Sequence, residues 1–146
     1  MKEHIYILDD HPMIAEGTAQ LLMTDERYQV TIGKHYSELY NFIESNPISL
    51  LIIDYELQDK TALDLLPYLQ KKIPQTPVLV YTMHTEFWII KLLIKKEVAG
   101  IVSKNDNTSE IKKAIESILL TKNKILLSHS TQYRIVTCRR SFCNRF

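Results

Sequence analysis

Five polar side chains of this chain stand where short hydrophobic runs end. Asp9 and Asp10 follow the run HIYIL, and Asp54 follows SLLII. The run PVLVY ends at Thr82, and Lys104 follows GIVS. Carboxylates packed together repel one another, and a divalent cation such as Mg²⁺, which prefers oxygen ligands, relieves that repulsion. One carboxylate of such a group can also attack a phosphoryl donor and form an acyl phosphate.

The hydroxyl and the ammonium group suit the same chemistry. Phosphoryl transfer depends on positioning and charge neutralisation more than on elaborate acid–base catalysis. Lys104 could pair with the transferred phosphoryl group, and Thr82 could hydrogen-bond it. Taken singly, each residue has an ordinary explanation: an Asp that caps a helix or starts a turn, an N-cap at Thr82, a solvated Lys104. Their combination indicates a site, because all five fall at the same end of their strands.

Alternating strands and helices must position these residues. Short apolar runs predict five strands, at His4–Leu8, Gln29–Ile32, Ser49–Ile53, Val78–Tyr81 and Ala99–Val102. Helical spacing predicts a helix after each strand, namely from Pro12, after a cap at Ser37, around Leu63–Leu69, over Phe87–Lys96 and after a cap at Asn107. Five βα units predict an α/β fold, a doubly wound parallel sheet with helices on both faces. We expect the five polar side chains to converge, because the carboxyl ends of parallel strands share one edge.

The composition excludes several classes of protein. With 146 residues, 24% of them charged and a net charge of +1, the chain is typical of one globular domain. No apolar run could cross a membrane and no signal peptide is apparent, so we expect a cytoplasmic protein without membrane contact. The three glycines form no phosphate-binding loop, and Cys138 and Cys143 match no zinc or redox motif. Only His11 and His84 fall near the predicted site; His84 could gate water there, or be an ordinary loop residue.

The strings YILDDHPMIAEG, LLIIDYEL, VLVYT and AGIVSKN together resemble the receiver domain of bacterial two-component response regulators. DDHP and SKN resemble the NarL/FixJ (LuxR-type) branch in particular, and the resemblance spans about residues 3–125. It implies a flavodoxin-like fold with five strands in the order 2-1-3-4-5 and five helices. It also implies a receiver domain over residues 1–127, with 128–146 as a linker or tail that could be disordered or artefactual.

The resemblance implies a role for each site residue. Asp54 would be the phosphoacceptor, Thr82 the switch hydroxyl and Lys104 the lysine that pairs with the phosphoryl group. The implied ligands of Mg²⁺ are Asp9, Asp10, Asp54 and the main-chain carbonyl of Glu56.

Three positions depart from the family pattern. The family usually has proline four residues after the phosphoacceptor and glycine eight after it, where this chain has Gln58 and Ala62. It often has an aromatic residue three before the lysine, where this chain has Ile101. We therefore expect a differently shaped loop after Asp54, with no site ligand lost. Ile101 also weakens the expectation that phosphorylation is signalled by a rotamer change of an aromatic side chain.

The predicted helix Phe87–Lys96 is apolar on all sides rather than along one stripe. Such a helix is buried or binds a partner, and the output surface of the family often includes this helix. We therefore expect an interface with a partner or a second copy at Trp88, Ile90 and Ile101. In the alternative, the helix is mostly core and Trp88 lies flat on the surface.

The preferred hypothesis for function is a phosphorylation-switched signalling domain. A sensor histidine kinase would donate a phosphoryl group to Asp54, and the new charge would shift a protein-interaction surface. Transcription control would belong to a longer protein with a helix-turn-helix output domain. This chain is too short to include that domain, so we expect no DNA binding by the chain itself. A homodimer is compatible with this hypothesis.

Two other hypotheses belong to different classes. One is a receiver-fold interaction module that phosphorylation does not switch, which Gln58, Ala62 and Ile101 favour and the intact site opposes. The other is a Mg²⁺-dependent phosphohydrolase with an aspartyl nucleophile, which the lack of a second acid–base carboxylate after Asp54 opposes. We therefore expect no enzyme in the ordinary sense, but a phosphoacceptor that takes part in its own phosphorylation and dephosphorylation.

Overall fold

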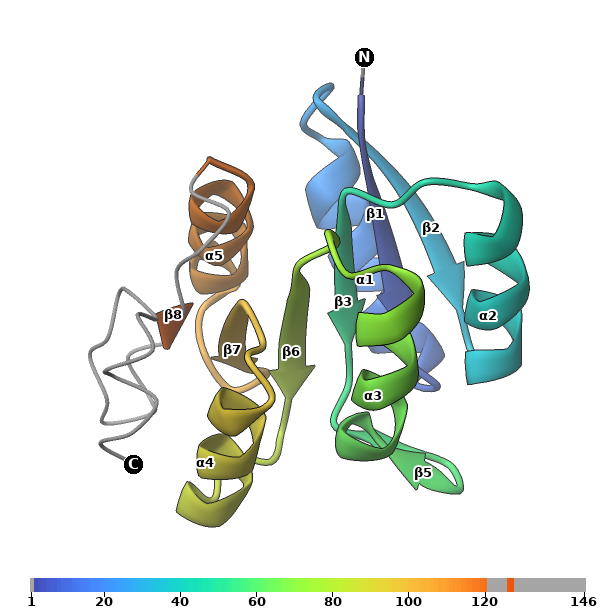
Figure 1. The fold of residues 1–146 in the computed structure, drawn as a ribbon. Coiled ribbons are helices and arrows are strands. Elements are labelled where there is room, and N and C mark those ends of the chain that lie inside the picture. The colour runs from blue at the N-terminus through green and yellow to red at the C-terminus, as the bar shows by residue number, and fades with distance from the viewer. Residues whose placement is uncertain (1, 121–125, 128–146) are drawn as a thin grey trace.

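The computed structural model describes residues 2–120, 126 and 127, and a parallel sheet forms its centre (Figure 1). The sheet has the strand order β2-β1-β3-β6-β7-β8, with every neighbouring pair parallel. Its strands are β1 (Glu3–Leu8), β2 (Tyr28–Gly33), β3 (Leu50–Ile53), β6 (Val78–Thr82), β7 (Gly100–Ser103) and β8 (Leu126–Leu127). The predicted order 2-1-3-4-5 is confirmed, because it corresponds to β2-β1-β3-β6-β7. The two-residue strand β8 was not predicted.

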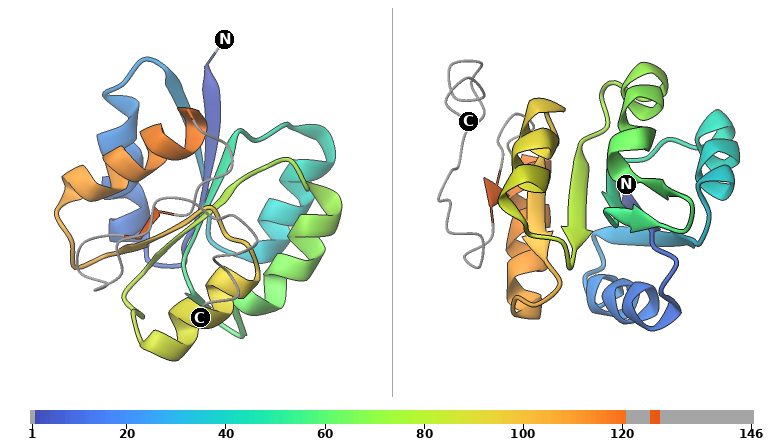
Figure 2. Two further views of the ribbon diagram at one scale, coloured as in Figure 1. Left: turned by 60° about the vertical axis from the view of Figure 1, so that its left-hand side comes forward. Right: turned by 90° about the horizontal axis from the view of Figure 1, so that it is seen from below.

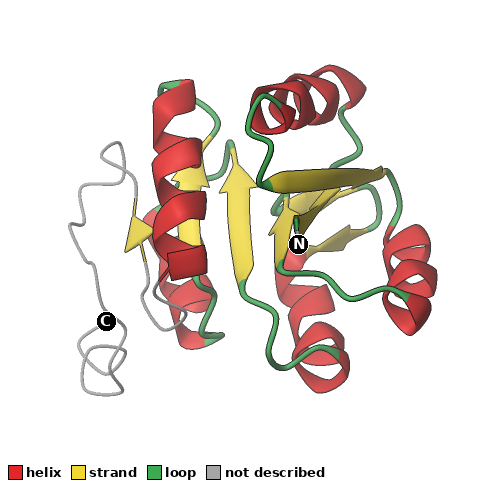
Figure 3. Cartoon of the chain, turned by 90° about the horizontal axis from the view of Figure 1, so that it is seen from above, coloured by secondary structure: helices red, strands yellow, loops and turns green. Residues whose placement is uncertain are grey.

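Helices cover both faces of the sheet, as predicted (Figures 2 and 3). Helices α1 and α5 lie on one face, and α2, α3 and α4 lie on the other. Their bounds are α1 (Pro12–Met23), α2 (Tyr36–Ser45), α3 (Ala62–Lys72), α4 (Phe87–Lys95) and α5 (Thr108–Leu120). Among the described residues, none of these helices has the length and apolar content that a membrane crossing requires.

Two hydrophobic cores explain why the central strands are apolar throughout. All four residues of β3 are buried, and alternate side chains enter opposite cores. Leu51 and Ile53 pack in the core beneath α2, α3 and α4, while Leu50 and Ile52 pack in the core beneath α1 and α5. A strand covered on both faces has no polar side, so the polar groups of the site can stand only at its ends.

The structure corrects some local predictions. Ser37 lies inside α2, and the N-cap is His35, whose ring accepts a hydrogen bond from the Ser37 backbone N–H at 3.1 Å. Thr82 is the last residue of β6 and not a helix cap. A small antiparallel hairpin, β4 (Glu56–Leu57) with β5 (Lys60–Thr61), was not predicted, because two-residue strands are too short to show a period.

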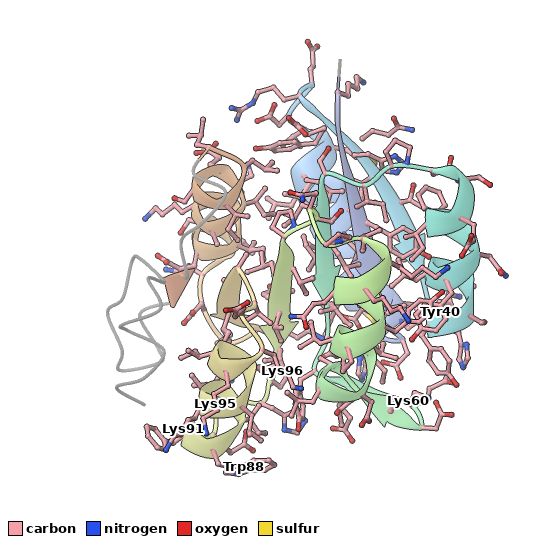
Figure 4. The ribbon with its side chains drawn as sticks, viewed as in Figure 1. Tyr40, Lys60, Trp88, Lys91, Lys95 and Lys96 are labelled. Carbon is pink, nitrogen blue, oxygen red and sulfur yellow. The ribbon has the colours of Figure 1, made fainter. Side chains whose placement is uncertain are left out.

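Helix α4 divides its apolar side chains between core and surface. The predicted interface residues Ile90 and Ile101 are 3% and 0% exposed, so neither side chain offers surface to a partner in this structure. Both pack in the core between the sheet and α3 and α4. Trp88 is 59% exposed and points outward near Lys91 and Lys95 on the same helix (Figure 4). The surface part of the prediction therefore reduces to Trp88.

Candidate functional site

The predicted site residues come from four neighbouring strands of the sheet. Asp9 and Asp10 follow β1, Asp54 follows β3, Thr82 ends β6 and Lys104 follows β7. These strands lie in the order β1-β3-β6-β7, so their carboxyl ends form one continuous edge.

Backbone hydrogen bonds continue the sheet into the site residues. The Asp54 backbone N–H donates to the Leu8 carbonyl at 3.1 Å, and the Lys104 backbone N–H donates to the Thr82 carbonyl at 2.9 Å. These bonds hold the first residue beyond each strand in register with its neighbour. The expected convergence of residues from separate strands follows from this register.

A buried ammonium group joins two of the carboxylates. Lys104 Nζ lies 2.8 Å from Asp9 Oδ2 and 2.8 Å from Asp54 Oδ2. The three side chains are only 3%, 4% and 5% exposed, respectively. Burial raises the pKa of Asp54, although the hydrogen bond from Lys104 opposes that shift. Burial alone would lower the pKa of Lys104, but its hydrogen bonds to Asp54 and Asp9 outweigh this effect and raise it.

The third carboxylate has a buried oxygen without a hydrogen bond. Asp10 Oδ1 is inaccessible to solvent and has no hydrogen-bond partner in the described structure. His11 Nδ1 lies 3.1 Å from this oxygen, but the geometry makes no hydrogen bond. Such an atom needs a partner when buried. A cation held by Asp9, Asp10 and Asp54 would satisfy it, so these side chains fit the implied Mg²⁺.

His11 belongs to this cluster, and the sequence analysis assigned it no role. Its Nδ1 lies 3.0 Å from Asp9 Oδ1 and 3.6 Å from Asp54 Oδ2. One ligand atom each from Asp9, Asp10, His11 and Asp54 lies within 4.8 Å of all the others. The string Asp9-Asp10-His11 was a signal for this cluster, because an imidazole directly after two carboxylates can fold back over them.

Thr82 and His84 lie at and just after the end of β6, the strand next to β3. The Thr82 side chain is fully buried, and its Oγ1 accepts a hydrogen bond from the His84 backbone N–H at 3.0 Å. His84 Nε2 lies 2.7 Å from Glu56 Oε2, which links the loop after β6 to the start of β4. Burial lowers the pKa of His84, but hydrogen bonds to Glu56 and Glu86 outweigh burial and raise it.

The loop after Asp54 has a backbone shape that suits its unusual residue. Gln58 has a φ of 27°, and its N–H donates to Asp10 Oδ2 at 3.4 Å. Proline holds φ near −65° and has no N–H, so it could neither adopt this conformation nor make this contact. Ala62 is buried at the start of α3, and its N–H donates to the Tyr55 carbonyl at 2.7 Å. The two departures therefore fit the hairpin that follows Asp54.

Similar proteins of known sequence include regulators of transcription. The probable transcriptional regulatory protein SgaR of Hyphomicrobium methylovorum is 25% identical over 118 residues, which cover 80% of this chain and 56% of that protein. The methanol utilization control regulatory protein MoxX of Paracoccus denitrificans is 28% identical over 109 residues, which cover 73% of this chain and 49% of that protein. The chain thus spans about half the length of these curated relatives.

Solved structures show the same fold. The isolated REC domain of RcsB from Salmonella enterica serovar Typhimurium, in the presence of phosphomimetic BeF3-, matches with a TM-score of 0.79 and 22% identity. That match covers 90% of this chain and 97% of the REC domain. A LuxR family two-component response regulator from Aurantimonas sp. SI85-9A1 matches with a TM-score of 0.81 and 21% identity, covering 90% and 94% of the two chains.

The sequence model of the response regulator receiver domain matches residues 5–116, a range that contains most of β1, all of β2 to β7 and every residue of the cluster of Asp9, Asp10, His11 and Asp54. The fold, the cluster at the carboxyl edge and this match agree with one another. The chain therefore belongs to the response regulator receiver domain family.

Proposed function

We propose that this chain is a phosphoacceptor that receives a phosphoryl group on Asp54 in a Mg²⁺-dependent reaction. The observation that carries the proposal is the buried group formed by Asp9, Asp54 and Lys104, together with Asp10 Oδ1, which has no hydrogen-bond partner among the described residues. A structural salt bridge would need one carboxylate for one ammonium. Here two carboxylates share one lysine and a third, that of Asp10, belongs to the same cluster, so the excess negative charge favours a divalent cation.

Asp54 is the nucleophile in this proposal. One oxygen of its carboxylate forms a bond to phosphorus, while the bond from phosphorus to the donor breaks and its electron pair stays with the donor. The donor is a phosphohistidine of a sensor histidine kinase or a small acyl phosphate. The raised pKa of Asp54 indicates a carboxylate poorly stabilised by water, and charge neutralisation around it lowers the cost of transfer.

Lys104 and Thr82 respond to the transferred group. Lys104 Nζ already lies 2.8 Å from Asp54 Oδ2, so it can contact a phosphoryl oxygen bonded to that residue. Thr82, at the end of the adjoining strand, can hydrogen-bond another phosphoryl oxygen if its hydroxyl turns away from the His84 backbone. Asp9, Asp10, Asp54 and the Glu56 carbonyl would hold Mg²⁺, which when bound neutralises charge on the phosphoryl group.

The same proposal covers the output and the partners. New charge at Asp54 shifts a surface formed by α4, β7 and α5, where Trp88 is exposed, and a second copy of the chain is one candidate partner. Relatives named as a probable transcriptional regulatory protein and a transcriptional activator protein suggest transcription control by a longer protein through a separate output domain. The receiver domain spans residues 1–127 in this proposal, acts in the cytoplasm and does not itself bind DNA.

Intact-mass measurement tests the phosphoacceptor. The protein is incubated with Mg²⁺ and a small acyl phosphate, alongside the Asp54→Asn variant and a sample with chelator. We expect one phosphoryl adduct on the parent, none on Asp54→Asn and none without metal. A folded parent that binds Mg²⁺ and gains no adduct would contradict the proposal.

One observation favours a second function, an interaction module that phosphorylation does not switch. Ile101 is 0% exposed where the family often has an aromatic switch, so a rotamer change at this position cannot carry a signal to the surface. Trp88, the single tryptophan, discriminates the two functions by its fluorescence. An emission spectrum that is the same before and after formation of the adduct would favour the unswitched module.

A further inference from the structure

We infer that His11 Nδ1 is a ligand of the cation site, which makes this site selective for divalent transition metals that accept imidazole nitrogen. The inference rests on the proposed function, because it concerns the same cation site. Mg²⁺ prefers oxygen ligands alone, whereas imidazole suits ions such as Ni²⁺ and Co²⁺. His11 would therefore add affinity for those ions and little for Mg²⁺.

The carboxylate oxygens near His11 differ from those that Lys104 holds. Lys104 Nζ contacts Asp9 Oδ2, whereas His11 Nδ1 lies 3.0 Å from Asp9 Oδ1 and 3.1 Å from Asp10 Oδ1. The two oxygens near the ring are therefore not the ones that the ammonium group contacts. A cation held by the ring and these two oxygens would leave the two oxygens that Lys104 contacts in place.

The spacing of these atoms matches one octahedral metal ion. Two adjacent ligands at about 2.1 Å from an octahedral ion lie about 3.0 Å apart. The ring nitrogen makes two such spacings, 3.0 Å to Asp9 Oδ1 and 3.1 Å to Asp10 Oδ1. Asp10 Oδ1 is buried and has no hydrogen-bond partner in the described structure, so one of these ligand atoms lacks another role.

The backbone holds the ring in this place. The His11 N–H donates to Asp9 Oδ1 at 2.9 Å, which folds the chain back over the carboxylate. Pro12 then begins α1, and its ring sterically restricts the backbone of His11, which is extended. The His11 side chain is 59% exposed, so solvent and ions reach its free face. A ligand that is already oriented loses less entropy when a metal binds.

The competing explanation is that the ring only donates a hydrogen bond from Nδ1 to Asp9 Oδ1 at 3.0 Å. In that case His11 orients the carboxylates, and its removal should affect every divalent cation alike. Ligation by nitrogen predicts a selective effect. The two roles are therefore separable by comparing a nitrogen-accepting ion with Mg²⁺.

Isothermal titration calorimetry of the full chain with Ni²⁺ and with Mg²⁺ tests the inference. Cys138 and Cys143 are replaced by serine in every protein of the series, because thiols also bind Ni²⁺. His11→Gln is compared with the parent and with His35→Gln, a matched control whose ring caps α2 and lies outside the acidic cluster. Asp10→Asn reports on loss of an oxygen ligand.

We expect His11→Gln to weaken Ni²⁺ binding by at least about tenfold, since even changes around a ligand cost roughly 10–100-fold. Mg²⁺ affinity should stay within about threefold, and His35→Gln should match the parent. Unchanged Ni²⁺ binding in His11→Gln, or an equal loss for both ions, would overturn the inference. Failure of the proposed function is a different result: the parent would bind Mg²⁺ and give no adduct at Asp54.

Discussion

Replacing Lys104 with methionine isolates the electrostatic core of the site. Methionine is similar in length and apolar, so the substitution removes charge with little change in volume. In the parent, Nζ is the shared partner of Asp9 Oδ2 and Asp54 Oδ2, each at 2.8 Å. In the variant, two carboxylates that are 4% and 5% exposed lose their common cation.

The expected loss of unfolding free energy at pH 7 is about 3–5 kcal/mol, the cost of leaving a buried charge without its partner. The matched control is Lys113→Met. Lys113 is 70% exposed and its nitrogen lies 3.6 Å from Glu110, so its loss should cost about 0.5 kcal/mol or less. The difference between the unfolding free energies of the two variants therefore reports how far burial strengthens the charge interactions of Lys104.

The deficit of Lys104→Met should depend on pH in a defined direction. Burial raises the folded-state pKa of Asp54, and loss of the ammonium raises it further. A carboxyl group whose pKa is higher in the folded state than in the unfolded state destabilises the fold. The loss of unfolding free energy is complete at a pH above the folded-state pKa, and it disappears as the pH falls below the unfolded-state pKa near 3.9. The deficit should therefore be largest at neutral pH and should shrink as the pH falls towards 4.

Urea unfolding followed by circular dichroism measures these quantities for the parent and both variants at pH 7 and pH 5. Repeating the pH 7 series with Mg²⁺ should restore more stability to Lys104→Met than to the parent, because the cation takes over charge neutralisation. A loss below about 1 kcal/mol, or a loss that grows as the pH falls, would refute the description of a buried, mutually dependent charge cluster.

Three further predictions concern the fold and the site walls. Gly33→Ala should destabilise the domain by about 1–3 kcal/mol, because an added Cβ would lie 2.8 Å from Cζ of the buried Tyr6 ring. Gly17→Ala in α1 should instead stabilise the domain by about 0.5–1 kcal/mol, because an added Cβ there has no atom within 4 Å. Urea unfolding compares the two variants. The imidazole of His84 should titrate above 6.5 by NMR and move down in Glu56→Gln, since the carboxylate holds its proton; an unchanged pKa in that variant would contradict the pairing. The fluorescence emission of the exposed Trp88 should change when the parent acquires the phosphoryl adduct. The emission of Asp54→Asn should stay constant with the same donor. This comparison checks that α4 responds to the site.

Local properties of the sequence were sufficient to predict the sheet and its reactive edge. Apolar runs of four to six residues appear as β1, β3, β6 and β7, and the crossover rule for βα units makes them parallel. Once the strands are parallel, residues directly after them share an edge. The convergence of Asp9, Asp54 and Lys104 follows from their sequence positions, because the end of a strand can be recognised from the sequence alone.

Other features depended on contacts between distant segments. The composition of α4 showed an apolar helix, but only packing decided that Ile90 lies in the core and Trp88 at the surface. The link between His84 and Glu56 joins the loop after β6 to the start of β4, and nothing in either segment's sequence predicts it. Sequence periodicity specifies which side chains could be buried, and the neighbouring elements determine which of them are.

The chemistry of the site divides in the same way. The chain order alone placed three carboxylates, a hydroxyl and an ammonium group at one edge, because each follows its own strand. Only the tertiary structure decided that Lys104 holds one oxygen of Asp9 while His11 lies over the other. Residue types and strand ends are local properties, whereas the direction of a side chain depends on every group packed around it.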